Sequence, residues 1–459
     1  MARFVDANRT QRFLLPLDME EWIPSDDLVH FIIEAAERVD MAAFKINWRG
    51  SGSEQYHPRM MLTLLVYCYA NGIFSSRRIE RATYRDIGVR FAAANTHPDH
   101  DTICAFRRNN ADAIAAAFLE ILLLAKELKL LKVGMVSIDG TKLDANASKH
   151  QSIRYDRARQ LRAQLEIDIA ELMAKAENAD ADGGDDPQAL PEEIARREAL
   201  KAKMDAACTR LEAQAKARAE TERAPYEAKL KAHEARGGKG RKPKPPKDTP
   251  DDDEQTNLTD PDSRIMRKNK HSEYRQAYNA QATVDADGTQ LVLATGVSRS
   301  ASDANELVGG IDAIPDALGQ PETALADTGF ANGEAIAELE ARGLEVLVAI
   351  GAGGNERTYD FRPPKETKPP PEIKAQWRLD MKAKLETEKA KAKYRKRKHT
   401  VEPVFGIIKS VLGFRHFFLR GLDKVKLEWQ LVALAYNAKR LHKMVQVQQP
   451  ASRPICGSV

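Results

Sequence analysis

Three carboxylates occupy positions from which they could act on one substrate. Asp139 ends the apolar run "MVSID", Asp327 ends the run "TALAD", and Glu402 follows the basic stretch "KAKAKYRKRKH" at the start of a helical pattern. In open α/β sheets, ligands and reacting groups gather at the carboxyl ends of the strands. If the two strands are neighbours, the aspartates meet at one edge of the sheet, although 188 positions separate them.

Three converging carboxylates repel one another unless cations compensate their charge. Oxygen-rich sites of this kind suit Mg²⁺ or Mn²⁺. Two such ions activate a water or a 3′-hydroxyl and stabilise the leaving oxygen of a phosphodiester. Asp139, Asp327 and Glu402 together therefore predict phosphoryl transfer with two bound divalent ions.

Each acid also has a purely structural interpretation. Asp139 and Asp327 stand close to Gly140 and Gly329, as turn residues do. Glu402 suits the first turn of a helix, where the helix dipole favours a negative charge. The order strand, strand, helix favours a common site over three separate coincidences.

The surrounding pattern predicts the elements that position these acids. Residues 133–139 predict a strand, and 274–298 predict a β-hairpin around Asp287-Gly288, followed by alternating helices and strands. The helix that begins at Val401 has a predicted apolar face, with Glu402 and Lys409 at its margin. That face consists of Val401, Val404, Phe405, Ile408, Val411 and Leu412. The pattern indicates an α/β unit that is interrupted after its first strand.

The remaining segments differ in composition from this unit. Residues 1–130 show helical periodicity, and basic helices such as "SSRRIERATYRD" suit either DNA phosphates or a solvated face. Residues 151–236 predict an arm of two antiparallel helices, or else a surface insertion without chemical duty. We expect a flexible charged linker over 237–271, a basic segment over 355–400 and a disordered tail over 446–459.

The composition narrows the cellular setting. Four cysteines without metal-like spacing make a disulfide framework improbable and favour a reducing cytoplasm. No stretch approaches the ~20 apolar residues that cross a bilayer, so we expect no membrane contact. The net charge of +4 is small, and local basic patches therefore carry more information than the total.

Several sequence blocks together resemble the DDE transposases of bacterial insertion sequences, in the branch with a helical N-terminal domain. "SIDGTKLDANASK" resembles the block of the first aspartate, "NAQATVD" the hairpin after it, and "ADTGF" the block of the second aspartate. "VEPVFGIIKSVLGFRHFFLRGL" and "EWQLVALAYNAKRL" are similar to the glutamate block, and "LLPLDMEEWIPSDDLVHFI" and "DHDTICAFRR" to the N-terminal region. The similarity covers most of the chain except roughly 155–260 and 355–390.

The resemblance implies an α/β ribonuclease H-like catalytic domain over 131–150 and 272–445, with a mixed five-stranded sheet and flanking helices. An all-α N-terminal DNA-binding or assembly domain over 1–130 precedes it, and the helical arm is an insertion after the first strand. Asp139, Asp327 and Glu402 would ligate Mg²⁺ or Mn²⁺, two ions in all. The implied partners are double-stranded DNA, both transposon terminal inverted repeats and target, and a second copy of the chain in a homodimer or larger assembly. The implied location is the bacterial cytoplasm, at the nucleoid when DNA is bound.

The family signature around the glutamate also implies DNA contacts. It reads Tyr, two residues, Arg, three residues, Glu, six residues, Lys. Glu402 and Lys409 keep this spacing, but four residues separate Arg397 from Glu402, so Lys398 is a rival to Arg397 as a contact to the transposon end. Lys409, Arg415 and Arg420 lie where substrate phosphates must pass, and Lys or Arg there would make binding depend on salt.

Other assignments stay open on the sequence alone. Trp377 and Trp429 could stack on an extruded base, although Trp429 stands among leucines that favour helix packing. Two rivals to the transposase remain, a transposase-derived DNA-binding protein that no longer cuts and a metal-dependent nuclease for other nucleic acid. All three acids are present, which disfavours the first rival.

Overall fold

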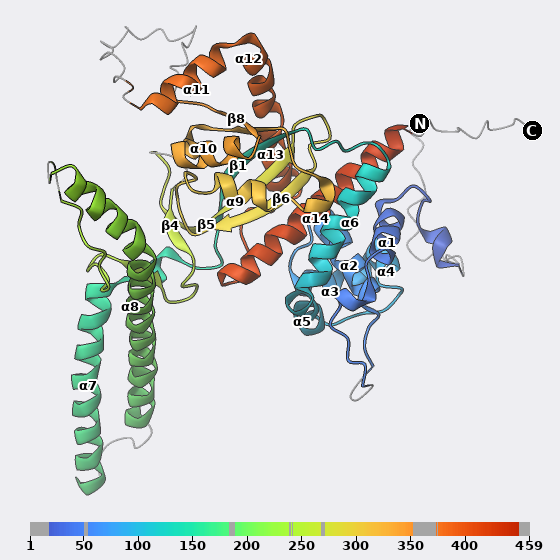
Figure 1. The fold of residues 1–459 in the computed structure, drawn as a ribbon. Coiled ribbons are helices and arrows are strands. Elements are labelled where there is room, and N and C mark those ends of the chain that lie inside the picture. Colours follow the sequence, from blue (N-terminus) through green and yellow to red (C-terminus); the bar gives the residue numbers. More distant parts are fainter. Residues whose placement is uncertain are drawn as a thin grey trace, which may run out of the picture. The chain divides into compact units, whose positions relative to one another are not determined.

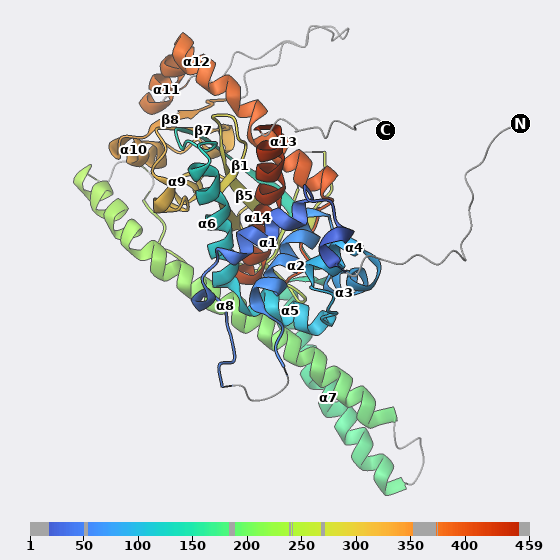
Figure 2. The same ribbon diagram turned by 90° about the vertical axis from the view of Figure 1, so that its right-hand side faces the viewer.

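The computed structural model describes residues 18–49, 54–182, 189–237, 240, 242–267, 271–351, 373 and 375–448. The chain divides into two compact units, Met1–Leu143 with Asn279–Val459, and Asp144–Tyr278. The ribbon is shown in two views (Figures 1 and 2). Within the described ranges, no helix is long and apolar enough to span a membrane.

The N-terminal part of the first unit is helical, as the sequence predicts. Its helices are α1 (Leu28–Glu37), α2 (Pro58–Ala70), α3 (Ser76–Arg85), α4 (Ile87–Ala92), α5 (His100–Asn109) and α6 (Ala111–Glu127), with short 3-10 turns at Met19–Trp22 and Met41–Ala43. Every residue of α2 from Met61 to Ala70 is buried, and α1, α4, α5 and α14 (Leu422–Gln448) pack around it. α2 is therefore the central helix of this region.

A mixed sheet forms the rest of the first unit's core. Six strands are described in this sheet, β1 (Met135–Asp144), β4 (Arg264–Met266), β5 (Arg275–Asp285), β6 (Val292–Ser298), β7 (Thr323–Ala326) and β8 (Glu345–Val348). Of these, β4 and the first four residues of β5 are counted in the second unit. The order is β4-β5-β1-β7-β8, with β6 also paired to β5. β1, β7 and β8 run parallel, whereas β5 and β6 form the predicted antiparallel hairpin. The predicted mixed sheet is confirmed, but β4 adds a sixth strand to the expected five.

Helices flank this sheet, and one of them joins it to the N-terminal region. They are α9 (Leu307–Asp312), α10 (Gly333–Ala341), α11 (Gln376–Glu386), α12 (Glu388–Arg395), α13 (Val401–Gly406) and α14. α14 packs on β6 and also on α2 and α6, which lies beside it in Figure 1. The predicted N-terminal and catalytic segments thus share one compact unit.

The first strand ends later than the sequence predicts. β1 runs from Met135 to Asp144, so Asp139 lies inside the strand rather than at its end. Residues Met135 to Ile138 are buried, Asp139 to Lys142 are only half-covered, and Leu143 is buried again. The change from apolar to polar residues at Asp139 marks the end of continuous burial, whereas the strand itself continues to Asp144.

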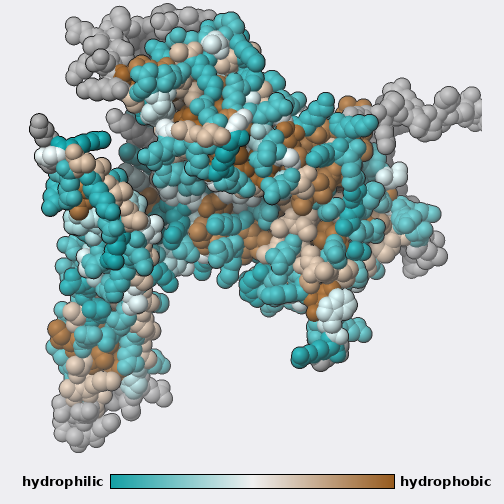
Figure 3. Space-filling model, viewed as in Figure 1, coloured by the Kyte–Doolittle hydropathy of each residue, from teal (hydrophilic) through white to brown (hydrophobic). Residues whose placement is uncertain are grey.

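The second unit contains the helical arm. Its two long helices, α7 (Tyr155–Asp182) and α8 (Ala189–Ala235), pack through Leu165, Met204 and Leu211. Ion pairs join Arg162 to Asp205 and Lys201 to Glu166, so residue numbers rise along one helix as they fall along the other. The two helices are therefore antiparallel, as predicted. Hydrophilic residues cover much of their visible face (Figure 3).

Part of the range predicted as a linker has regular structure. β3 (Gln255–Asn257) pairs with β2 (Ser152–Arg154), and β4 pairs with β5. Asn257 Nδ2 donates to the Ser148 carbonyl at 2.8 Å, which fixes this segment near the base of the arm. Polar composition concealed these short strands, because their pairing depends on backbone hydrogen bonds. In the predicted basic segment, 352–372 and 374 lie outside the described residues, as does 449–459 of the predicted tail.

Candidate active site

Parallel pairing brings the two aspartates together. Met135, Val136 and Ser137 of β1 pair with Thr323, Ala324 and Leu325 of β7. The same register, continued for two residues, sets Asp139 beside Asp327, which directly follows β7 and caps the 3-10 turn Thr328–Phe330. The two strands are therefore neighbours, which is the condition on which the meeting of the aspartates depended.

Asp139 lies in surroundings that disfavour its charge. Its side chain is only 17% exposed. The pKa of Asp139 is raised to about 7, mainly by burial and then by the negative charge of Asp327, against the opposing effects of the Gly140 N–H and the Arg397 guanidinium. A cation beside the two aspartates would relieve this repulsion.

Arg397 connects Asp139 to Glu402. Its Nη1 lies 3.5 Å from Asp139 Oδ2, and its Nη2 lies 3.5 Å from Glu402 Oε1. Arg397 is 13% exposed, whereas Glu402, in the first turn of α13, is 54% exposed. The structure thus places Asp327 beside Asp139 and connects Glu402 to Asp139 through one guanidinium.

Tyr394 positions the segment that carries Arg397. Its hydroxyl donates to the carbonyl of Ala326, the last residue of β7, at 3.0 Å. The 3-10 turn Lys396–His399 follows, and Thr400 closes it by donating to the Lys396 carbonyl at 2.7 Å. Arg397 is therefore the residue that this turn directs to the carboxylates, while Lys398 is exposed.

The predicted cations Lys409, Arg415 and Arg420 follow α13 in the chain. This helix passes into a π-helix over Ile407–Val411, and Lys409 there donates to the Thr141 hydroxyl and to the Lys142 carbonyl of β1. Arg415 donates from Nε to the Lys409 carbonyl at 3.1 Å, and both Arg415 and Arg420 are exposed. All three cations lie on the segment that follows Glu402.

The π-helix corrects one sequence prediction. Val411 was expected on the apolar face of this helix but is 70% exposed. A π-helix turns less per residue than an α-helix, because its hydrogen bonds close over five residues instead of four. Val411 is therefore rotated out of the apolar face, while Ile408 and Leu412 stay buried.

The donor chemistry fits a divalent metal. Asp139, Asp327 and Glu402 offer only carboxylate oxygens, the ligands that Mg²⁺ and Mn²⁺ prefer. Among the described residues, however, no three His, Cys, Asp or Glu side chains stand close enough to hold one ion. Arg397 occupies the space between Asp139 and Glu402, so Glu402 joins the aspartates only through this guanidinium.

A fourth carboxylate, Asp303, lies at this site and was missed from the sequence. It belongs to the loop between β6 and α9, and its Oδ1 accepts hydrogen bonds from Asn279 at 2.6 Å and Gln281 at 3.2 Å. Burial raises the pKa of Asp303, the Asn279 hydrogen bond opposes this, and the charge of Asp327 adds to it. The sequence signal was the pair of amides in the strand "QAYNAQATVD", because buried amides need partners.

Trp429 and Trp377 each contact the backbone of another element. Trp429 is buried, and its indole donates to the Gln281 carbonyl at 2.7 Å, so the helix-packing interpretation is confirmed. Trp377 packs against the backbone of Gly333, and Arg378 lies over its ring at 5.1 Å.

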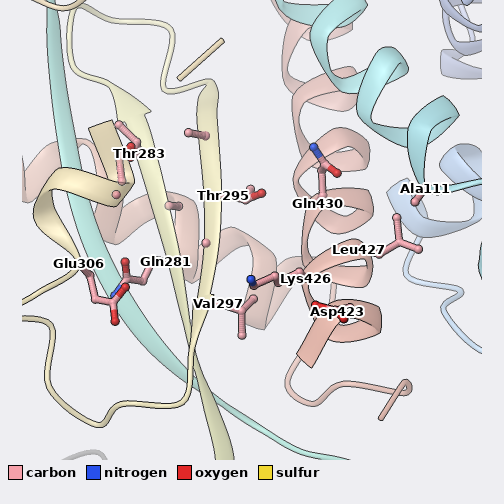
Figure 4. Close-up of a pocket in the computed structure, with 15 residues that line it drawn as sticks. Ala111, Gln281, Thr283, Thr295, Val297, Glu306, Asp423, Lys426, Leu427 and Gln430 are labelled. Carbon is pink, nitrogen blue, oxygen red and sulfur yellow. Dashed lines mark hydrogen bonds between the residues drawn. The ribbon is translucent and has the colours of Figure 1, made fainter. Parts of the chain in front are cut away.

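A pocket of about 480 Å³ opens beside this site, bounded by β5, β6, α9 and α14. Gln281 and Glu306 line it from one direction, and Lys426 and Gln430 of α14 line it from the other (Figure 4). Gln281 is shared between the pocket wall and the hydrogen bonds of Asp303. The pocket is thus adjacent to the fourth carboxylate.

Two family models match the chain. Residues 17–109 match a transposase domain (DUF772), and residues 243–438 match the transposase DDE domain. No curated protein and no solved structure matches. The second range contains Asp327 and Glu402 and begins after Asp139, which the sheet itself connects to Asp327.

Proposed function

We propose that this chain, which belongs to the DDE transposases, cleaves DNA at the terminal inverted repeats of an insertion sequence and joins those ends to target DNA. The DDE transposases are a family of phosphoryl-transfer enzymes. The adjacency of Asp139 and Asp327, produced by parallel pairing of β1 and β7, carries this proposal. It brings two acids from distant parts of the chain into one place, where their mutual repulsion favours a cation.

The residues of the proposed active site have separate roles. Asp139, Asp327 and Glu402 would hold divalent metal, Mg²⁺ or Mn²⁺ and two ions in all, which supplies activation of a water or 3′-hydroxyl and stabilisation of the leaving oxygen. Tyr394 holds the segment of Arg397 against β7. For Glu402 to act with the aspartates, Arg397 must leave the space between them, and a DNA phosphate offers its guanidinium a bidentate partner.

The cations near Glu402 are the proposed contacts to the DNA backbone. Lys398, Arg415 and Arg420 are exposed, and Lys409 is fixed on β1 beside Asp139. Phosphate contacts from such residues set the position of the duplex but read no sequence. We propose that Arg397 and Lys409 contact the DNA at the scissile region. Lys398, Arg415 and Arg420 would contact the flanking backbone.

Helix α3 is a second proposed DNA surface. Arg77, Arg78, Arg81 and Arg85 are all exposed, and none of them forms an ion pair within the described residues. At 100° per residue, the four lie within about a third of the helix circumference, opposite buried Ile79 and Thr83. The helix's acid, Glu80, is engaged by His100, whose Nδ1 lies 2.8 Å away. The arginine face is therefore not neutralised locally, as suits a polyanion.

Synapsis of two transposon ends requires two copies of the catalytic site. We therefore propose a homodimer or larger assembly on DNA. Cleavage of end-containing duplex, scrambled duplex and RNA–DNA hybrid, each with Mg²⁺, tests the proposed function. Preference for the end-containing duplex supports it, and equal cleavage of all three would show a general nuclease instead.

A further inference from the structure

Asp303 is fixed by contacts that hold one carboxylate oxygen and leave the other directed at the site. Oδ1 accepts from both Asn279 and Gln281, which stand two residues apart on β5 and thus on the same face. Among the described residues, no hydrogen bond holds Oδ2. The carboxylate is therefore oriented by β5, although it belongs to a loop.

Two glycines make room for this carboxylate. A Cβ on Gly140 would lie 2.5 Å from Asp303 Oδ1, closer than such atoms approach. A Cβ on Gly329 would lie 2.9 Å from Asp327 Oδ1 and 3.4 Å from Asp303 Oδ2. Gly140 follows Asp139, and Gly329 lies two residues after Asp327. The backbone beside both aspartates thus lacks side chains where Asp303 approaches.

Asp303 adds negative charge where the structure already concentrates it. Oxygens of Asp303 and Asp327 lie within 3.4 Å of one point beside Gly329. Two nearby carboxylates repel, so this approach lowers stability unless a cation compensates it. The positive charge of Lys142 opposes this repulsion.

We propose that Asp303 is a positioning residue for the reaction proposed above, a fourth carboxylate that strengthens divalent-metal binding at the Asp139–Asp327 pair. This inference rests on the proposed function, because that function supplies the divalent metal. The three-acid arrangement assigns no role to Asp303, whereas this proposal assigns one to it, on the loop between β6 and α9.

The test is Asp303→Asn, which removes the charge yet keeps an oxygen to accept from Asn279 and Gln281. Mn²⁺ binding to the whole chain without DNA is measured by electron paramagnetic resonance, and the Mg²⁺ dependence of end cleavage is measured separately. A unit charge a few ångströms from a divalent ion in water-like surroundings predicts about tenfold weaker Mn²⁺ binding and a similar rise in the Mg²⁺ requirement. Affinity for end DNA without metal should stay within about twofold.

Asp316→Asn is the matched control. Asp316 is exposed in the 3-10 turn between α9 and β7, and its Oδ1 accepts from Gln320, a bond that asparagine also makes. Its Mn²⁺ affinity should equal that of wild type. If Asp303→Asn also binds Mn²⁺ as wild type does, the proposal is overturned.

If Asp303→Asn does not fold, Asp303→Glu and Asp303→Gln replace it, since they match in size and differ in charge. Tighter Mn²⁺ binding by the glutamate variant supports the proposal, and equal binding overturns it. If wild type binds Mn²⁺ but cuts no end DNA, weaker Mn²⁺ binding by Asp303→Asn would keep this inference while removing the proposed function. A wild-type chain that binds no Mn²⁺ would overturn both.

Discussion

Arg397 Nη1 lies 3.5 Å from Asp139 Oδ2, although 258 positions separate the two residues in the chain. The same guanidinium reaches Glu402, so a positive side chain occupies the place between two proposed metal ligands. The metal and Arg397 should therefore compete for these carboxylates, and DNA should decide between them.

The first prediction concerns this competition. Arg397→Gln removes the positive charge next to Asp139, so Mn²⁺ binding without DNA should become several-fold tighter. Affinity for end DNA should fall at the same time, because a phosphate partner is lost. Lys398→Gln, which changes the charge of the exposed neighbour, should weaken DNA binding only modestly and leave Mn²⁺ affinity unchanged. Equal effects of the two variants on Mn²⁺ would refute the special position of Arg397.

The second prediction concerns pH. The folded pKa of Asp139 is about 7, above the unfolded value of roughly 3.9. Because the folded state holds this proton more tightly, the unfolding free energy of the metal-free chain should fall as pH rises from about 4 to about 7. Asp139→Asn removes this loss and should be more stable than wild type at pH 8 by on the order of 4 kcal/mol, with no such difference below pH 4. Urea denaturation with a chelator present measures it, and a constant difference across this range would show that Asp139 does not titrate in this way.

The third prediction concerns a buried charge pair that couples the N-terminal helices to α14. Arg107 of α5 donates to Tyr69 at 2.6 Å and lies 4.0 Å from Glu428, which also accepts from the backbone N–H groups of Phe418 and Leu419. Arg107→Met leaves Glu428 buried without its cation and should cost about 3 kcal/mol of unfolding free energy. Arg108→Met, at the adjacent exposed position, should change it by less than about 0.5 kcal/mol. If chemical denaturation gave the same unfolding free energy for Arg107→Met and Arg108→Met, the charge pair would contribute nothing to stability.

The fourth prediction concerns α3. Replacing Arg78 and Arg81 by alanine should weaken binding to end DNA and lower the slope of log affinity against log salt by about 2, as expected for two phosphate contacts. The control variant replaces Lys216 and Arg223, two exposed cations of α8, by alanine. Both variants then lose two positive charges. An unchanged slope in the α3 variant would identify its arginine face as merely solvated.

The sequence predicted the elements better than their ends. Strand, hairpin and helix types followed from the hydrophobic period. The pairing of β1 with β7 did not, because on the sequence it was only the condition for the two aspartates to meet. The extension of β1 past Asp139 was missed because the strand continues through four residues, Asp139 to Lys142, that are only half-buried. The π-helix at Ile407–Val411 was missed because a hydrophobic pattern assumes a constant turn per residue.

The site was predictable where strand direction decides it and not where loops do. Asp139 and Asp327 follow apolar strands, so their meeting depends only on which strands are neighbours. Asp303 follows no strand, and two amides of β5 fix its place. The choice between Arg397 and Lys398 likewise depended on the 3-10 turn Lys396–His399, which spacing alone does not reveal.

Phosphoryl transfer on transposon ends is the reaction proposed for Asp139, Asp327 and Glu402. Its most direct test is single-turnover cleavage of end DNA with Mg²⁺ by Asp139→Asn, Asp327→Asn and Glu402→Gln, beside the exposed control Glu386→Gln. We predict that each of the three lowers the cleavage rate at least ~10³-fold while binding end DNA as wild type does, and that the control cleaves normally. Full cleavage by any one of the three would contradict the assignment of these acids to catalysis.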